Sequence, residues 1–242
     1  MIMNKIKIYL ITFIFSMICY GNAVAGTGAA TEYKITIYKM ELCDSTSTAS
    51  VCNGAVTVYD GNSGAIDIAN TTAGAAAASL GNAGVAKFGT SYTYMQITMG
   101  RAFTVKGSAA DDSGTTCYTK SGEAGAAGTL AKGTVTAGSV ASTTLYAAMV
   151  GTSVGDNLTG LSSLTDTTGV ASTIASNDEY FQYRQQLAST FIMFPGNIPS
   201  VEVAFGTTNA VGAIDDMGDA CETVGAAKGL YAAEPDVTVT IK

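Results

Sequence analysis

The stretch that decides the fold is YKITIYKMELC, residues Tyr33–Cys43. Up to Ile37 every second residue is apolar, so these side chains share one face of an extended strand. From Tyr38 onward the apolar positions shift by one residue, to Tyr38, Met40 and Leu42. A one-residue change of phase within a strand is what a β-bulge produces. The stretch therefore predicts a long β-strand with a bulge near Tyr38.

Alternation of apolar and polar residues recurs along the chain, between turns rich in Gly, Asn, Asp and Ser. The predicted strands lie at residues 56–58, 65–69, 92–106, 115–119, 134–136, 140–150, 187–194, 201–205 and 237–241. Residues 177–187 also show helical spacing, but we favour a strand because their surroundings are β. About ten short strands with polar turns predict an all-β fold, an antiparallel β-sandwich of jelly-roll or immunoglobulin-like type, stapled by disulfides.

Arg101 is unusual within the longest predicted strand, because it falls on the same face as Met99 and Phe103. Either Gly100 bends the strand and turns Arg101 outward, or Arg101 is buried against a carboxylate. We expect a bend, or a side chain that reaches the surface, because long charged side chains are rarely fully buried.

The first 25 residues have the pattern of a secretory signal peptide. Lys5 and Lys7 form a positive start, residues 8–18 form a short apolar run, and Ala23 and Ala25 form an A-x-A cleavage site. The run is too short to span a bilayer comfortably, and an uncleaved anchor is the alternative. We therefore expect an exported chain that starts at residue 26 and is extracellular, on the cell surface or in the periplasm, without a transmembrane segment.

Charge and composition exclude several classes of function. The net charge is −7, and removing the two lysines of the signal peptide makes it −9. An acidic chain without a basic cluster is not expected to bind nucleic acid. The chain contains no histidine, so the G-x-S-x-G match at residues 151–155 lacks the base that this motif needs. Adjacent acids such as Asp111-Asp112 point to opposite faces of a strand and form no catalytic pair. We expect no enzymatic activity.

The cysteines that remain after cleavage are Cys43, Cys52, Cys117 and Cys221. An even number in an oxidising compartment predicts two disulfides, for which three pairings are possible. Cys43 and Cys52 flank a polar stretch that fits a hairpin tip; if they pair, Cys117 must pair with Cys221. A metal site is the competing interpretation, but the chain has no C-x-x-C motif and no histidine.

An acidic stretch near the C-terminal end is the best candidate for a metal site. Asp215, Asp216, Asp219 and Glu222 surround a glycine and offer the oxygen ligands that Ca²⁺ prefers. Their order does not match an EF-hand loop, and a solvated acidic loop is the alternative interpretation. We expect no other cofactor.

The order of features along the chain is shared with a known group of proteins. A signal peptide leads directly into the strand 33–43, the body is rich in Gly, Ala and Thr, and the chain ends in an alternating strand. In this order the chain resembles secreted bacterial surface or fibre subunits of the pilin-like β-sandwich kind. In such subunits an extended terminal segment completes a neighbour's sheet by strand addition. The candidate segments here are Gly26–Glu32, expected to be flexible, and Val237–Ile241.

We therefore expect one secreted β-sandwich domain over residues 26–242, with a Gly/Ala/Thr-rich insertion around 121–176. The expected role is that of a non-enzymatic structural or adhesive cell-surface protein, a filament subunit that associates with itself or with other surface proteins. A calcium- or carbohydrate-binding module on the same fold is the alternative, and a carboxylate-based hydrolase is a third hypothesis.

The calcium hypothesis predicts that millimolar Ca²⁺ raises the melting temperature of the mature chain, because a ligand that binds only the folded state stabilises it. Thermal unfolding followed during a Ca²⁺ titration measures this. An unchanged melting temperature at millimolar calcium removes the hypothesis, and Mg²⁺ at the same concentration serves as the control for ionic strength.

Overall fold

The computed structural model describes residues 26–49, 51–70, 81–111, 113–126, 130–146, 162–165, 169–171, 180–196, 199–215 and 228–241. Within these ranges the regular structure is β-strand apart from two short 3-10 helices, which confirms the all-β prediction. The elements are β1 (Gly26–Gly28), β2 (Ala30–Asp44), β3 (Val56–Asp60), β4 (Ala65–Asp67), η1 (Ala83–Val85), β5 (Ser91–Gly100), β6 (Ala102–Ala110), β7 (Thr116–Thr119), β8 (Gly133–Thr134), η2 (Ala137–Ser139), β9 (Thr143–Tyr146), β10 (Ser162–Thr165), β11 (Gly169–Ala171), β12 (Tyr180–Ile192), β13 (Val201–Gly206), β14 (Val211–Asp215), β15 (Lys228–Ala232) and β16 (Asp236–Ile241).

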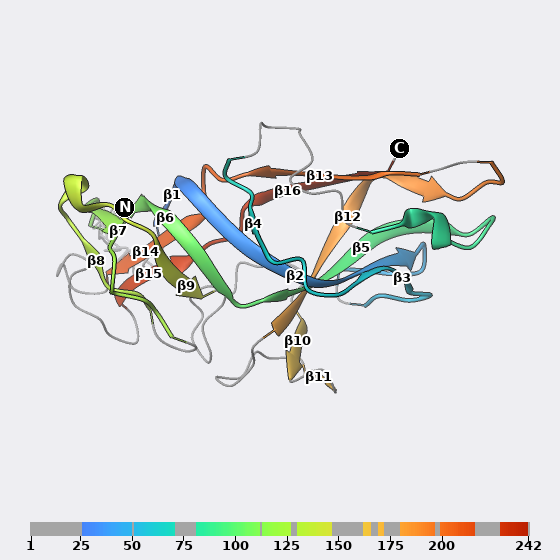
Figure 1. Ribbon diagram of the computed structural model, residues 1–242, viewed down its shortest axis with the longest axis horizontal. Helices are drawn as coiled ribbons and strands as arrows, with labels where there is room; N and C mark the ends of the chain where they lie inside the picture. The colour runs from blue at the N-terminus through green and yellow to red at the C-terminus, as the bar shows by residue number, and fades with distance from the viewer. Residues whose placement is uncertain are drawn as a thin grey trace, which may run out of the picture.

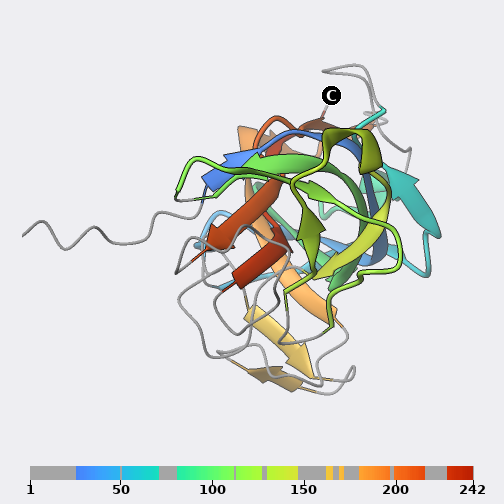
Figure 2. The same ribbon diagram turned by 90° about the vertical axis from the view of Figure 1, so that its left-hand side faces the viewer.

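Most of the described strands belong to one large sheet, whose main path runs β11-β10-β12-β5-β2-β6-β7-β8 (Figure 1). Strands β3 and β4 pair with β2, β9 pairs with β6, and β16 lies between β12 and β13. A second sheet has the order β1-β14-β15. Seen from the end of the molecule, β10 and β11 project away from the other strands (Figure 2). The assignment to a jelly-roll or immunoglobulin-like sandwich stays a prediction.

Strand β2 bends where the sequence predicts a bulge. Its pairing with β5 shifts in register between Ile37 and Lys39, which places the irregularity at Tyr38. On its other edge, the amides of Gly61 and Ser63, which lie between β3 and β4, donate to the carbonyl oxygens of Tyr38 and Ile37 at 2.9 and 3.0 Å. The bulge prediction is therefore confirmed. The half of β2 before the bend pairs with β4 and β6, and the half after it pairs with β3 and β5.

The core follows from the apolar face of β2. Tyr33, Ile35 and Ile37 are buried before the bulge, and Met40 and Leu42 are buried after it, as the change of phase requires. Aromatic rings from neighbouring strands extend this core: the ring centroids of Tyr33 and Phe103 are 5.3 Å apart, and those of Phe103 and Phe181 are 6.1 Å apart. Residues 180–187 are part of β12, so the choice of strand over helix is confirmed.

Arg101 is completely buried, so the expectation that it reaches the surface is wrong. The expected bend is present, since β5 ends at Gly100 and β6 begins at Ala102. The bend turns the side chain inward, because β9 pairs with β6 at this point and brings Tyr146 beside Ala102. The guanidinium carbon of Arg101 lies 6.0 Å from the centroid of the Tyr146 ring, within the range of a cation–π interaction.

The start of the chain after the predicted cleavage site is built into the fold, so the expectation of a flexible segment at Gly26–Glu32 is wrong. Strand β1 pairs with β14, and β2 begins at Ala30, which is buried. Both strands pack on β6 so closely that a Cβ atom added to Gly107 would lie 2.3 Å from the carbonyl oxygen of Ala29. Glycine is required at this contact because its backbone can approach another strand directly.

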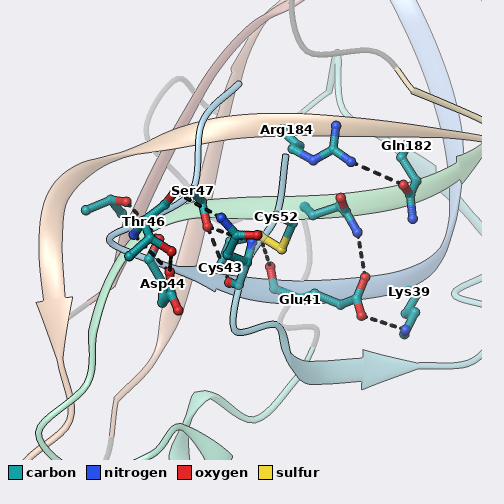
Figure 3. The surroundings of a disulfide bond; sticks show 12 residues. Lys39, Glu41, Cys43, Asp44, Thr46, Ser47, Cys52, Gln182 and Arg184 are labelled. Carbon is teal, nitrogen blue, oxygen red and sulfur yellow. Dashed lines mark hydrogen bonds and ion pairs between the residues drawn. A yellow bond between two sulfur atoms is a disulfide. The ribbon is translucent and has the colours of Figure 1, made fainter. Parts of the chain in front are cut away.

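A disulfide joins Cys43 to Cys52, as predicted, and closes the tip of the turn between β2 and β3 (Figure 3). Paired backbone hydrogen bonds between Thr48 and Val51 complete this tip. Cys117 is buried and is also disulfide-bonded. Its predicted partner, Cys221, lies outside the described residues.

Replacing Gly107 with alanine is expected to lower the free energy of unfolding by about 2–3 kcal/mol, because the new methyl group overlaps backbone atoms of Ala29 and Ala30 that cannot move aside. Denaturant unfolding measures the change. Gly138→Ala is the matched control: nothing lies within 4 Å of a Cβ there, so its effect should stay within about 0.5 kcal/mol. Equal effects of the two substitutions would contradict the close crossing of β1 and β2 over β6.

Candidate functional site

An apolar cavity of about 60 Å³ lies between the strands of the large sheet. One wall comes from β2, β4, β5, β6 and β12, and the other comes from β13, β16, the end of β15 and the segment between β15 and β16. The residues that line it are Tyr33, Ile35, Ile37, Met40, Ile66, Ile68, Ile97, Met99, Phe103, Phe181, Tyr183, Val201, Val203, Phe205, Ala232, Ala233, Glu234, Pro235 and Val237. The cavity therefore adjoins the aromatic core at the bend of β2.

The β13 wall of the cavity is half-exposed. Val201, Val203 and Phe205 occupy every second position of β13 and line the cavity, as the pleat of a strand requires. All of β13 is partly exposed, and Ile66 on β4 is partly exposed too. Among the described strands, β13 pairs only with β16 and β4 pairs only with β2. The cavity is thus bordered by two strands that each have one strand partner in the described part of the chain.

Two tyrosine hydroxyls supply polar groups in this apolar wall. The hydroxyl of Tyr33 donates to the carbonyl oxygen of Ala233 at 2.9 Å, and that of Tyr183 donates to Oε1 of Gln185 at 2.6 Å. Burial raises the pKa of Tyr33 far above its usual value, and the charge of Glu234 adds to the effect. Burial, followed by a hydrogen bond with Glu234, also raises the pKa of Tyr183. Both hydroxyls therefore stay protonated and act as donors, not as bases or nucleophiles.

The size of the cavity limits what it can hold. Pockets for drug-sized ligands have volumes of roughly 300–1,000 Å³, whereas one water molecule occupies about 30 Å³ in the liquid. A cavity of about 60 Å³ with an apolar lining accommodates a group the size of one aliphatic side chain. The arrangement can bind an apolar side chain, and its tyrosine hydroxyls act as hydrogen-bond donors.

A second cluster is polar and lies on the other face of β2, β5 and β12 (Figure 3). The register places Glu41, Gln96 and Arg184 side by side on adjacent strands. Nε2 of Gln96 donates to Oε2 of Glu41 at 2.7 Å, and Nζ of Lys39 donates to Oε1 at 2.6 Å. Burial lowers the pKa of Arg184, while the negative charge of Glu41 acts in the opposite direction. The hydrogen bond between Gln96 and Glu41 joins β5 to β2, and the register places Arg184 of β12 beside them.

The predicted calcium ligands are not brought together by any described contact. Asp215 ends β14, but its side chain is outside the described part, as are Asp216, Asp219 and Glu222. Within the described residues, no group of three or more acidic, cysteine or histidine side chains is placed to hold a metal ion. The cleavage-site residues Ala23 and Ala25 and the G-x-S-x-G match also lie outside the description.

Neither the cavity nor the polar cluster was predicted from the sequence. The signal for the polar cluster was present, since Glu41, Gln96 and Gln182 alternate with the apolar residues of their strands. The apolar alternation of β13 and β16 was visible too, but nothing local indicates that these strands leave a cavity over β2.

Nothing in the described residues forms a helix of the length and hydropathy that crossing a membrane demands.

Replacing Tyr33 with phenylalanine is expected to lower the free energy of unfolding by about 1–2 kcal/mol, because the buried carbonyl oxygen of Ala233 loses its donor. Thermal or denaturant unfolding measures the change. Tyr59→Phe is the matched control, since Tyr59 is partly exposed and should tolerate loss of its hydroxyl. A Tyr33→Phe protein as stable as wild type would show that this hydrogen bond does not support the cavity wall.

The comparisons with known proteins add no relationship. No protein-family model matches the chain, and neither the curated proteins nor the solved structures contain a match to it.

Proposed function

We propose that the protein is a non-enzymatic, exported structural or adhesive subunit of the cell surface, which associates with a second copy of itself by strand addition beside the cavity. The observation that carries the proposal is the apolar cavity bordered by β4 and β13, each with one strand partner among the described residues. A strand at the edge of a sheet offers main-chain donors and acceptors to an incoming strand.

The geometry favours an extended occupant over a separate small molecule. Val201, Val203 and Phe205 form a half-exposed row with the two-residue period of a strand. A strand added along β13 would continue the layer formed by β13 and β16 toward Ile66 of β4. Its alternate apolar side chains would cover the open wall, and the cavity has the volume for one of them.

The second copy can supply such a strand from its own β13. An antiparallel pairing of two β13 strands centred on Val203 would place Val201 of one copy opposite Phe205 of the other. A contact of this kind is self-complementary, as a twofold dimer interface requires. The N-terminal segment is a poorer donor, because β1 and the start of β2 already pair within their own chain.

Composition supports a structural role in this proposal. The chain has no histidine and few charged residues, and its first residues have the pattern of an export signal. The predicted β-sandwich and the surface location belong to the same proposal. The twofold β13 pairing by itself closes a dimer, so assembly into a filament requires a second interface. The alternative, a calcium- or carbohydrate-binding module, is favoured by no contact among the described residues.

Cysteine cross-linking tests the proposed pairing. In an antiparallel pair centred on residue 203, the two Cβ atoms lie about 4.5–5.5 Å apart, close to the span of a disulfide. Val203→Cys in the mature chain is therefore expected to give a covalent dimer under mild oxidation, seen by non-reducing electrophoresis. Thr57→Cys, at an exposed position of β3, is the matched control and should stay monomeric.

Sedimentation of the unmodified mature chain provides the second measurement. We expect dimers or larger assemblies that persist in mild denaturant. A mature chain that remains monomeric at high concentration, together with equal cross-linking of the two cysteine variants, would exclude strand addition at β13.

A further inference from the structure

Asp111 carries a buried carboxylate whose two oxygens differ in their surroundings. It lies in the turn between β6 and β7 and is 4% exposed. Its Oδ1 accepts hydrogen bonds from the backbone amides of Ser113 and Thr115, at 3.0 and 2.7 Å, and from the Ser113 hydroxyl at 2.7 Å. Its Oδ2 is buried, and the described residues supply no donor to it. A buried carboxylate oxygen without a donor is costly, so this atom requires an explanation.

The side of β6 on which Asp111 lies faces β1. Gly107, Ala109 and Asp111 occupy alternate positions, and all three are buried. On this side, Gly107 is in direct contact with the backbone just after β1. Further along β6, a second close contact occurs. A Cβ atom added to Gly26 would lie 1.7 Å from the carbonyl oxygen of Ala110 and 3.6 Å from that of Asp111. The first residue of β1 therefore lies against the backbone at the end of β6, next to Asp111.

Gly26 is also the residue that follows the predicted cleavage site. Hydrolysis of the bond between Ala25 and Gly26 adds one water molecule, leaving a carboxylate on Ala25 and an ammonium group on Gly26. Before cleavage the nitrogen of Gly26 is a neutral amide with one hydrogen. After cleavage it carries a positive charge and several donor hydrogens, at a strand end that lies against the backbone of Ala110 and Asp111.

We infer that Asp111 is the binding site for the α-ammonium group of Gly26, and that removal of the signal peptide completes a buried ion pair between β1 and β6. The inference rests on the proposed export and cleavage of the chain. Glycine suits the position because the backbone contact with Ala110 leaves no space for a side chain. The ion pair fastens the sheet β1-β14-β15 to the large sheet only in the processed chain, which links maturation to stability.

A double-mutant cycle on the chain that begins at Gly26 tests the inference. The four proteins combine a free or acetylated α-amino group with Asp111 or with Asp111→Asn. Acetylation removes the charge, so with Asp111 present it should lower the melting temperature by roughly 5–10 °C, the range expected when one partner of a buried pair is lost. With Asp111→Asn the same acetylation should change the melting temperature little. Equal effects of acetylation in the two backgrounds would overturn the inference.

A second measurement needs no substitution at Asp111. In the native protein, an acylating reagent should modify the Gly26 amino group at least about tenfold more slowly than in the protein unfolded by guanidinium chloride, because the proposed ion pair holds this amino group against the buried carboxylate of Asp111. Lys87 is exposed and serves as the internal control, with similar rates in the two states. Peptide mass spectrometry reports both rates. Full reactivity of Gly26 in the native state would contradict the ion pair.

The identity of the first residue of the exported protein distinguishes a failure of this inference from a failure of the proposed export and cleavage. N-terminal sequencing of the exported chain shows whether it begins at Gly26. A different first residue would refute the predicted cleavage, whereas the cycle on the Gly26 chain would still measure whether Asp111 binds an ammonium group there. A normal start at Gly26 with no coupling to Asp111 would overturn the inference alone.

Discussion

The bend of β2 at Tyr38 is the constraint on which the arrangement of the strands depends. β2 has a neighbour on each edge, so a bulge in β2 alone would break the hydrogen bonds of its neighbours. Both neighbours are interrupted at the same level: residues 61–64 separate β3 from β4, and Arg101 separates β5 from β6. The shared interruption divides the molecule into two parts joined by continuous β2, as Figure 1 shows.

Close backbone contact dominates the part before the bend. Gly26, Gly28, Gly107 and Gly212 each lie where an added Cβ would meet another strand or an aromatic ring at about 2 Å. These four glycines thus allow close contact between β1, β6, β14 and β15, where larger residues would separate the strands. In the same part, the buried carboxylate of Asp111 has one oxygen to which the described residues supply no donor.

The part around and after the bend is packed with larger side chains, and its packing is incomplete. Aromatic rings from β2, β6 and β12 fill the region beneath the bend, but the layer of β13 and β16 leaves a cavity beside β4. On the opposite face, Glu41 and Gln96 join β2 to β5 through a buried hydrogen bond, which keeps these strands in register. In the proposed association, a strand added at the face with the cavity would leave the pairing behind it intact.

Much of the local structure could be predicted from the sequence. The phase change after Ile37, the hairpin tip at Cys43 and Cys52, the strand at residues 180–187 and the final strand were predicted because each depends on neighbours close in the chain. The inward turn of Arg101 was predicted wrongly, because its direction depends on Tyr146 of a distant strand. The flexible start was predicted wrongly for the same reason, since β14 and β6 hold it in place.

The sequence by itself indicated an all-β fold, the place where β2 bends and a hairpin tip between Cys43 and Cys52, and it contains no histidine. Only the tertiary structure decided that Val201, Val203 and Phe205 border a cavity over Tyr33, and that Asp111 lies against Gly26. The physical reason is that alternation fixes which face a side chain takes, whereas the strand that covers this face is set by long-range pairing and packing.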